Sequence, residues 1–210
     1  MLRYKLIKTG MLPTNTYVLY FNESNNCVVV DPSHDGGKVL DFLTENKLNL
    51  VGILLTHGHF DHCGGAKILT DKFKVPIFGS SLDSEIAANA SKNRWRARAD
   101  DCIITNYIDK SDSFSVDGFT FKVMGTPGHT DGSVCYFIEN LMLSGDTLFC
   151  GCVGRTDLWG GDSMKMRNSL QKIYQISEDY TVLPGHEDIT SLFTEKETNP
   201  YLKDEIKIYD

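Results

Sequence analysis

The pattern of apolar and polar positions divides the chain into alternating strands and helices. Short apolar runs bounded by turn residues predict strands, and apolar residues three or four positions apart predict helices. The predicted strands are residues 2–6, 17–20, 27–30, 51–55, 75–78, 114–116, 119–123, 134–138, 141–143 and 180–183. The predicted helices are residues 37–46, residues 65–73 and a segment that begins after Asp162, whereas residues 81–110 are helical at first and then ambiguous. This alternation predicts an α/β protein, an αββα four-layer sandwich of two mixed sheets with outer helices.

Turn residues support this division of the chain. Asn25-Asn26 and Glu139-Asn140 each separate two predicted strands. Asp117-Gly118 is the strongest hairpin signal, because both residues tolerate the positive φ that a tight two-residue turn requires. Asp162 has a side chain suited to cap the first turn of the helix that follows it. We therefore expect hairpins at the three pairs and a capped helix after Asp162.

Length and composition fit one globular domain. The chain has 210 residues, of which 41% are hydrophobic and 23% are charged. These values exclude a disordered, collagen-like or coiled-coil protein. The sequence contains neither an internal repeat nor a linker rich in Pro, Gly or Ser. We expect a single domain over residues 1–210.

Charge and hydropathy narrow the partners and the compartment. The 21 basic and 28 acidic residues give a net charge of −7, which argues against a nucleic acid as the main partner. The sequence has neither an apolar run long enough to span a bilayer nor the apolar block of a signal peptide. We therefore expect a cytoplasmic protein without a membrane partner, in which the six cysteines are reduced. Cys150 and Cys152 could form a soft-metal pair, but small, half-buried residues are the favoured interpretation.

The candidate chemistry lies in a dense histidine motif. His57, His59 and His62 fall within six residues, together with Asp61. The motif follows the predicted buried strand 51–55. In an extended loop, residues 57 and 59 project to one side, and residues 61 and 62, past the bend, can face a second point. Neutral imidazoles and a carboxylate suit Zn²⁺ or Fe²⁺, so the motif predicts a metal site.

Three further residues follow predicted strands. His129 and His186 lie in matching Pro-Gly-His turns, which makes both candidate ligands. Asp146 ends another strand, and a carboxylate at that place could bridge two metals. His34 is the remaining histidine, and we interpret it as a surface loop residue.

These motifs resemble the metallo-β-lactamase fold superfamily over nearly the whole chain. Residues 145–149 (Gly-Asp-Thr-Leu-Phe) and residues 153–158 (Val-Gly-Arg-Thr-Asp-Leu) look most like the short glyoxalase II-like hydrolases. Residues 194–202 resemble the segment after the last histidine of hydroxyacylglutathione hydrolases. The resemblance implies the metallo-β-lactamase sandwich and a dinuclear site for two divalent metal ions, with zinc foremost and iron or manganese as alternatives.

The resemblance also implies a role for each candidate ligand. It places His57, His59 and His129 on the first metal, Asp61, His62 and His186 on the second, and Asp146 between them. Asp61, His62 and Asp146 would be the residues most directly involved in catalysis. Asp31 resembles an aspartate that orients one of the ligands, although a helix or turn cap is an equally good interpretation.

The implied reaction is hydrolysis of the thioester of an S-acylglutathione, a small-molecule substrate, by a metal-bridging hydroxide. One departure concerns the carrier, because only 24 residues follow His186, too few for the helical C-terminal extension that helps hydroxyacylglutathione hydrolases bind glutathione. The first alternative is a persulfide dioxygenase with one iron on His57, His129 and Asp146. The second is another hydrolase of the same fold that acts on a lactone or a phosphodiester.

Arginines are the candidate substrate-binding residues. Arg94, Arg96 and Arg98 are three of the six arginines in the chain, and Arg155 lies in the segment that resembles the glyoxalase II-like hydrolases. A guanidinium group can bind a carboxylate of glutathione through two hydrogen bonds. With Trp95, these arginines would replace the missing extension. The alternative interpretation is a solvated helical face with a half-buried Trp, or a subunit contact.

Overall fold

The computed structural model describes residues 1–109 and 111–203, and within them two six-stranded sheets. The first sheet has its strands in sequence order. They are β1 (Leu2–Thr9), β2 (Thr14–Phe21), β3 (Asn26–Val30), β4 (Asn49–Leu54), β5 (Ile77–Gly79) and β6 (Asn106–Tyr107). β1, β2 and β3 pair antiparallel and the later strands pair parallel, so the sheet is mixed.

The second sheet runs in the order β12-β11-β10-β9-β8-β7. Its strands are β7 (Ser113–Val116), β8 (Phe119–Gly125), β9 (Val134–Ile138), β10 (Leu141–Gly145), β11 (Thr181–Pro184) and β12 (Thr190–Ser191). Only β10 and β11 pair parallel, and the other neighbours pair antiparallel. This sheet is therefore mixed as well.

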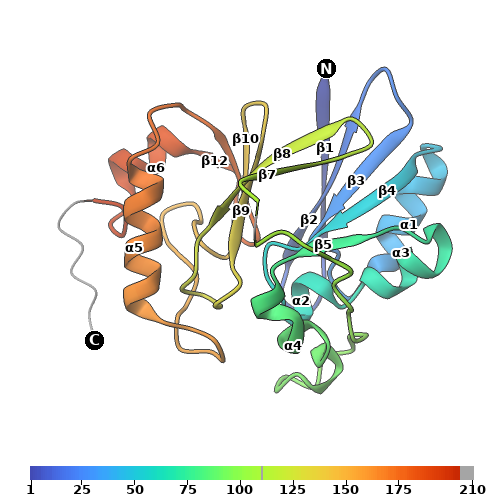
Figure 1. The fold of residues 1–210 in the computed structure, drawn as a ribbon, viewed down its shortest axis with the longest axis horizontal. Coiled ribbons are helices and arrows are strands. Elements are labelled where there is room, and N and C mark those ends of the chain that lie inside the picture. Colours follow the sequence, from blue (N-terminus) through green and yellow to red (C-terminus); the bar gives the residue numbers. More distant parts are fainter. Residues whose placement is uncertain (110, 204–210) are drawn as a thin grey trace.

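Helices cover the outer faces of the two sheets (Figure 1). On the first sheet they are α1 (Gly36–Glu45) and α3 (Ala66–Phe73), and on the second α5 (Ser163–Tyr174) and α6 (Leu192–Thr198). The one-turn helices α2 (Phe60–Cys63) and α4 (Ser84–Ala87) lie at one end, with 3₁₀ turns at Ser81–Asp83 and Ala90–Lys92. The longest described helix, α5, has 12 residues, whereas about 20 are needed to span a bilayer.

Three apolar cores separate the four layers. Strands β3 and β9 are buried on both faces, which is why they read as continuous apolar runs in the sequence. In β3, Val29 packs toward the helices of the first sheet, and its neighbours Val28 and Val30 pack between the sheets. In β9, Tyr136 packs between the sheets and Phe137 faces the core under α5 and α6. The αββα sandwich predicted from the sequence is confirmed.

The predicted turns at Asp117-Gly118 and Glu139-Asn140 form as expected, whereas the turn between β2 and β3 lies at residues 22–25 and Asn26 already belongs to β3. Asp117 and Gly118 have φ of 42° and 89°, the positive values of a tight hairpin turn between β7 and β8. The Asp162 side chain accepts a hydrogen bond from the backbone N–H of Lys165 at 2.9 Å and so caps α5. The turn residues thus fix element boundaries that apolar periodicity alone leaves open.

Short elements account for the differences from the sequence prediction. The helical turn α2, the two-residue strands β6 and β12, and helix α6 were not predicted. β5 begins at Ile77 rather than at residue 75, and Pro76, which has no N–H to donate to a sheet, stands just before it. Elements of two to four residues contain too few positions to show a periodicity, and α6, with seven residues, is only about two turns long.

The fold generates a prediction about the core between the sheets. Phe121 is fully buried there, with ring centroids 5.4 Å from Phe114 and 6.2 Å from Tyr136. Phe121→Ala should lower the free energy of unfolding by about 3–5 kcal/mol, because it removes apolar contacts and leaves a cavity. Phe193→Ala, at a ring that is 46% exposed, should cost about 1 kcal/mol or less. Equal losses for the two variants in urea titrations would contradict the assigned core.

Candidate metal centre

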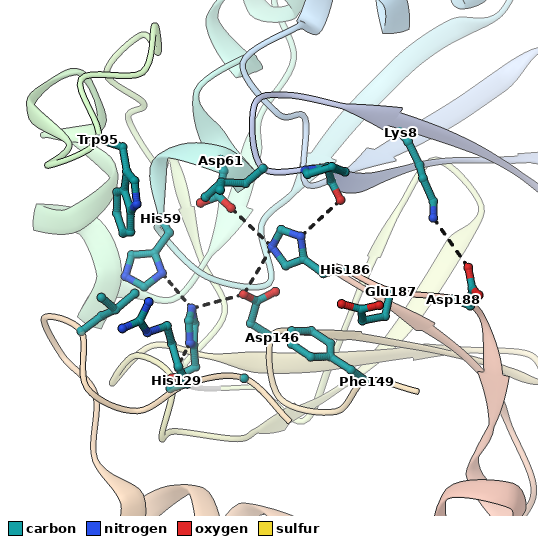
Figure 2. Close-up of a pocket in the computed structure, with 15 residues that line it drawn as sticks. Lys8, His59, Asp61, Trp95, His129, Asp146, Phe149, His186, Glu187 and Asp188 are labelled. Atoms are coloured by element: carbon teal, nitrogen blue, oxygen red, sulfur yellow. Dashed lines mark hydrogen bonds and ion pairs between the residues drawn. The ribbon is translucent and has the colours of Figure 1, made fainter. Parts of the chain in front are cut away.

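The candidate ligands converge because they follow strand ends. His57 lies after β4, His129 after β8, Asp146 after β10 and His186 after β11. In the second sheet β8, β10 and β11 point in the same direction, since β9 pairs antiparallel with β8 and β10 while β10 and β11 are parallel. Their carboxyl ends therefore meet at one edge of the sheet. Figure 2 shows the side chains from both halves of the chain directed at one place.

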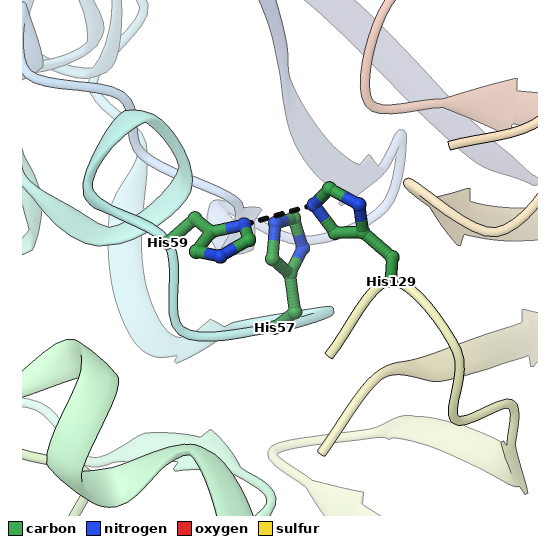
Figure 3. A group of neighbouring side chains, drawn as sticks. All are labelled: His57, His59 and His129. Carbon is green, nitrogen blue, oxygen red and sulfur yellow. Dashed lines mark hydrogen bonds between the residues drawn. The ribbon is translucent and has the colours of Figure 1, made fainter. Parts of the chain in front are cut away.

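The seven residues proposed as ligands from the sequence come together in overlapping groups. Their potential ligand atoms lie within 4.8 Å of one another in each group. The groups are His57 with His59 and His129 (Figure 3), Asp61 with His62 and His186, and His57 with His62 and Asp146. His59 thus groups with His57 and His129, and Asp61 with His62 and His186, while His57 and His62 meet again around Asp146. The one-turn helix α2 provides the bend, because it carries Asp61 and His62.

Asp146 lies between the two histidine groups. Its Oδ2 is 3.3 Å from His129 Nε2 and 3.6 Å from His186 Nε2. Its Oδ1 is 3.3 Å from His62 Nε2. The carboxylate therefore contacts histidines of both groups, which is the geometry that a bridging ligand needs.

The buried donor atoms fit divalent metal ions. His57 Nε2 and Asp146 Oδ1 are buried, and neither forms a hydrogen bond with any residue that the structure describes. A buried polar atom without a partner costs about 1–3 kcal/mol, and a cation at this point would remove that cost. A group of imidazole and carboxylate donors suits zinc and other divalent transition metals.

The protonation states also suit metal binding. Burial lowers the pKa of His57 and of His59, the latter to about 3, and the neighbouring imidazoles lower both values further. Burial opposes ionisation of Asp61, but His62 and His186 outweigh it and lower the pKa of its carboxyl. His57 and His59 are thus neutral and Asp61 is ionised, the forms that bind metal.

Hydrogen bonds to the second ring nitrogen orient four of the histidines. Nδ1 of His62 lies 3.0 Å from Asp31 Oδ2, and Nδ1 of His57 lies 3.1 Å from Thr56 Oγ1. Nδ1 of His129 lies 2.7 Å from the carbonyl oxygen of Arg155. Nδ1 of His186 lies 3.3 Å from the carbonyl oxygen of Pro13. Each of these contacts leaves Nε2 facing the centre.

Asp31 holds the histidine loop in place. Its carboxylate accepts hydrogen bonds from the backbone N–H of Thr56 at 2.8 Å and from the Thr56 hydroxyl at 2.7 Å, besides the contact with His62. This arrangement agrees with the interpretation that Asp31 orients a ligand. The alternative of a helix cap is wrong, because Asp35 occupies the N-cap position of α1.

Sequence analysis missed a second buried aspartate that connects two of the ligand loops. Asp83 is fully buried and accepts hydrogen bonds from Gly58 N–H at 2.8 Å, Thr130 Oγ1 at 2.7 Å and Gly132 N–H at 2.9 Å. These contacts bind the loop of His57 and His59 to the loop of His129. The sequence carries no local signal for this role, because the partners lie 25 to 49 residues away.

The absence of a side chain at Gly185 allows the site to close. A Cβ atom there would lie 2.3 Å from Asp146 Oδ1 and 2.6 Å from His62 Cε1, closer than real Cβ contacts. The glycine of the second Pro-Gly-His turn therefore lets the two groups approach each other. This gives a packing reason for the residue that precedes His186.

The metal site opens into a cleft of about 580 Å³. Its walls include His59, Asp61, His129, Asp146 and His186 together with residues from β1, the β1–β2 turn and the loops after β10 and β11. Of the arginines proposed to bind substrate, Arg155 lines this cleft. Its guanidinium binds Asp157 through two contacts of 2.6 Å.

The segment with the other three arginines differs from the prediction. It is not a helical face, and the exposure of its side chains alternates. Arg94, Arg96 and Arg98 point to solvent, whereas Trp95 packs against the core of the first sheet. Arg94 lines a neighbouring cleft, Arg98 lines a separate cavity, and Arg96 lines neither cleft at the metal site. The structure therefore does not bring the three together at the metal site, since alternation in an irregular segment spreads them apart.

The remaining candidates lie away from the centre. His34 is half-buried in the loop between β3 and α1 and lines the same separate cavity as Arg98. Cys150 is exposed and Cys152 is half-buried, and neither belongs to a metal-ligating group among residues 1–109 and 111–203. The soft-metal interpretation of this cysteine pair thus receives no support from the described site.

Comparison with known proteins gives a family match and close relatives. The family model of the metallo-beta-lactamase superfamily matches residues 9–186. Hydroxyacylglutathione hydrolase GloC of Haemophilus influenzae is 31% identical over 193 residues, which covers 88% of this chain and 91% of the relative.

Two solved structures have the same arrangement of sheets and helices. BLEG-1, described as a B3 metallo-beta-lactamase, is 33% identical with a TM-score of 0.89, and the match covers 95% of this chain and 99% of that chain. TTHA1623, in a di-iron-bound form, is 30% identical with a TM-score of 0.85, and the match covers 94% of this chain and all of that chain (100%).

The position of Asp146 generates the first prediction for this site. Asp146→Asn keeps the shape of the side chain but removes the charge shared by the two histidine groups. We expect its affinity for Zn²⁺ to fall at least about tenfold, measured by competition with a chromophoric chelator. His34→Ala should bind Zn²⁺ like the unaltered protein, because His34 lies in a separate cavity. Wild-type affinity in Asp146→Asn would contradict the bridging position.

A second prediction concerns pH. Burial lowers the pKa of His62, but Asp146, Asp61 and Asp31 outweigh it and raise that pKa to about 10. Metal binding at Nε2 must displace this proton, so affinity should rise with pH across the neutral range, by about tenfold per unit for one proton. Calorimetry at pH 7.5 in two buffers of different ionisation enthalpy measures the release directly. Metal binding without proton release would contradict the assignment.

Proposed function

The chain belongs to the metallo-beta-lactamase superfamily, as its motifs predict, and we propose that within it the protein hydrolyses the thioester of an S-acylglutathione with two divalent metal ions. It is a hydrolase of this superfamily with a His/Asp metal-binding cluster. The observation that carries the proposal is the position of Asp146 between two groups of three ligands. The similarity to hydroxyacylglutathione hydrolase GloC supports the choice of a thioester.

Zinc is the proposed metal. The cluster offers five histidines and two aspartates and no thiolate, a set that zinc accepts and iron shares. The di-iron form of TTHA1623, at 30% identity, supports two occupied positions and keeps iron as the alternative. Metal analysis of the purified protein decides between them.

Two bound cations would supply a water of lowered pKa and a Lewis acid for the carbonyl oxygen. The protein's own residues fix where this chemistry takes place. Asp146 faces both ligand groups, and Asp31 keeps the ring of His62 turned toward them. Because these carboxylates are buried and held by hydrogen bonds or ion pairs, the site needs little rearrangement during the reaction.

The cleft fixes the orientation of the proposed substrate. Apolar side chains on its wall, among them Leu12, Phe149 and Leu158, can contact an acyl group. Arg155 and Lys8 lie on the same wall. Arg155 forms an ion pair with Asp157, and Lys8 forms one with Asp188. Because both cations are already paired, we expect this wall to orient the acyl group, with the thioester carbonyl at the ligands.

Hydrolysis of a β-lactam is a second candidate function. The observation that favours it is the similarity to BLEG-1, described as a B3 metallo-beta-lactamase, at 33% identity. The same ligand groups would serve that reaction, because opening the ring also needs water attack on a carbonyl carbon. The two candidates differ in the substrate that the cleft accepts.

The proposal generates a comparison of substrates on protein of known metal content. S-lactoylglutathione should be hydrolysed faster than a β-lactam, and Asp146→Asn should reduce kcat at least about 100-fold, because it removes a group that acts at the reacting atoms. His34→Ala should retain full activity. Faster cleavage of the β-lactam would favour the second candidate. Oxygen uptake with glutathione persulfide that outpaces both hydrolyses would overturn the proposed function in favour of a dioxygenase.

A further inference from the structure

A second cleft adjoins the metal site on the side of His59. It has a volume of about 490 Å³, within the range of about 300–1,000 Å³ typical of small-molecule pockets. It shares His59, Trp95 and Leu158 with the first cleft, so a ligand that starts at the metal centre can continue into it. Its remaining wall comes from α4, the turn after it and the loop that carries Trp159.

Aromatic side chains form much of this wall. Trp95 is half-buried, with its ring centroid 5.3 Å from that of Phe60, and Phe60 itself lies on α2 next to the ligands. Trp159 is 61% exposed, an unusual position for a large apolar ring. These are the only two tryptophans in the chain, and both line the second cleft. A ligand that packs between them would remove apolar surface from water.

Among the described residues, some charged side chains on the wall of the second cleft have an ion-pair partner and others have none. Arg94 lies with its guanidinium carbon 4.8 Å from the centre of the Trp95 ring, and among the described residues it forms no ion pair. Within residues 1–109 and 111–203, the Lys92 side chain donates only to that of Asn89, at 2.7 Å. Asp157 is neutralised by Arg155, whereas the Glu85 carboxylate has no cationic partner in the described part of the chain. The cleft therefore presents two unpaired cations and one unpaired anion.

We propose that the second cleft binds the charged peptide part of a zwitterionic, peptide-like thiol carrier, with glutathione as the reference compound. The inference rests on the proposed function for the position of the thioester, and extends it to the carrier. A glutathione conjugate carries two carboxylates and one ammonium group at neutral pH, the inverse of the charges on the wall. Arg94 and Lys92 bind the carboxylates, Glu85 binds the ammonium group, and Trp95 packs against the backbone of the carrier.

This charge pattern separates peptide-like carriers from nucleotide carriers. A carrier such as coenzyme A has several phosphate charges and no ammonium group, so Glu85 would repel it without compensation. The segment proposed from the sequence as a row of three binding arginines thus contributes one arginine to this cleft, Arg94. Arg98 faces a separate cavity and serves as a control.

Tryptophan fluorescence tests the binding without any turnover. S-methylglutathione, a thioether that the enzyme does not cleave, should change the emission in a saturable manner, since both tryptophans line the cleft. Arg94→Ala and Glu85→Gln should each weaken its binding roughly tenfold, and Arg98→Ala should leave it unchanged. Equal affinity in all four proteins, the lack of a saturable signal, or tighter binding of coenzyme A would overturn the proposal.

Kinetic measurements with two thioesters test carrier binding in the second cleft separately from hydrolysis. Arg94→Ala should raise KM for S-lactoylglutathione roughly tenfold at unchanged kcat, and should leave KM for S-lactoyl-N-acetylcysteamine, which lacks the charged peptide part, unaltered. Equal effects on both thioesters would contradict binding of the carrier in the second cleft, but they would leave the thioesterase function in place. If neither thioester is hydrolysed but S-methylglutathione binds in an Arg94-dependent manner, the cleft stands and the proposed function fails.

Discussion

The structure depends on one electrostatic constraint, the burial of three carboxylates among five imidazoles where the two sheets meet. Asp31, Asp61 and Asp146 are all buried, as are His57, His62 and His129, and His186 and His59 close the group. Burying so many ionisable groups is costly unless they are paired or bind a cation. Asp146, within 3.6 Å of three imidazole nitrogens, is the point at which the two halves of the chain satisfy that requirement together.

The sandwich fold brings these ionisable groups together. Each sheet ends several strands at the same edge, and the three apolar cores keep the layers in register, so loops that follow β4, β8, β10 and β11 meet without long connections. Asp83 holds the loops of His57 and His129 together by accepting hydrogen bonds from Gly58 and Gly132. Gly185 leaves room for Asp146, because it has no side chain. Because the ligands lie on short loops held by rigid strands, the same arrangement leaves two open clefts for substrate beside them.

Much of the fold and the metal cluster could be predicted from the sequence, because their signals are local. Buried strands such as β3 and β9 read as apolar runs, and His57, His59 and His62 stand within six residues of each other. The two Pro-Gly-His turns extend this signal to His129 and His186. Asp83 was missed because its partners are distant in sequence, and the three arginines do not form one row at the site because residues 93–100 form neither a helix nor a strand. Likewise, the second cleft depends on the exposed position of Trp159, which no sequence pattern encodes.

The most direct test of the central claim is the number of metal ions that one chain binds. The protein is stripped with a chelator, loaded with excess Zn²⁺, freed of unbound ion by gel filtration, and its zinc and protein contents are measured by mass spectrometry. Two zinc ions per chain are expected, because Asp146 faces two complete groups of ligands. A single ion per chain that stays single in excess Zn²⁺, Mn²⁺ or Fe²⁺ would contradict the dinuclear site.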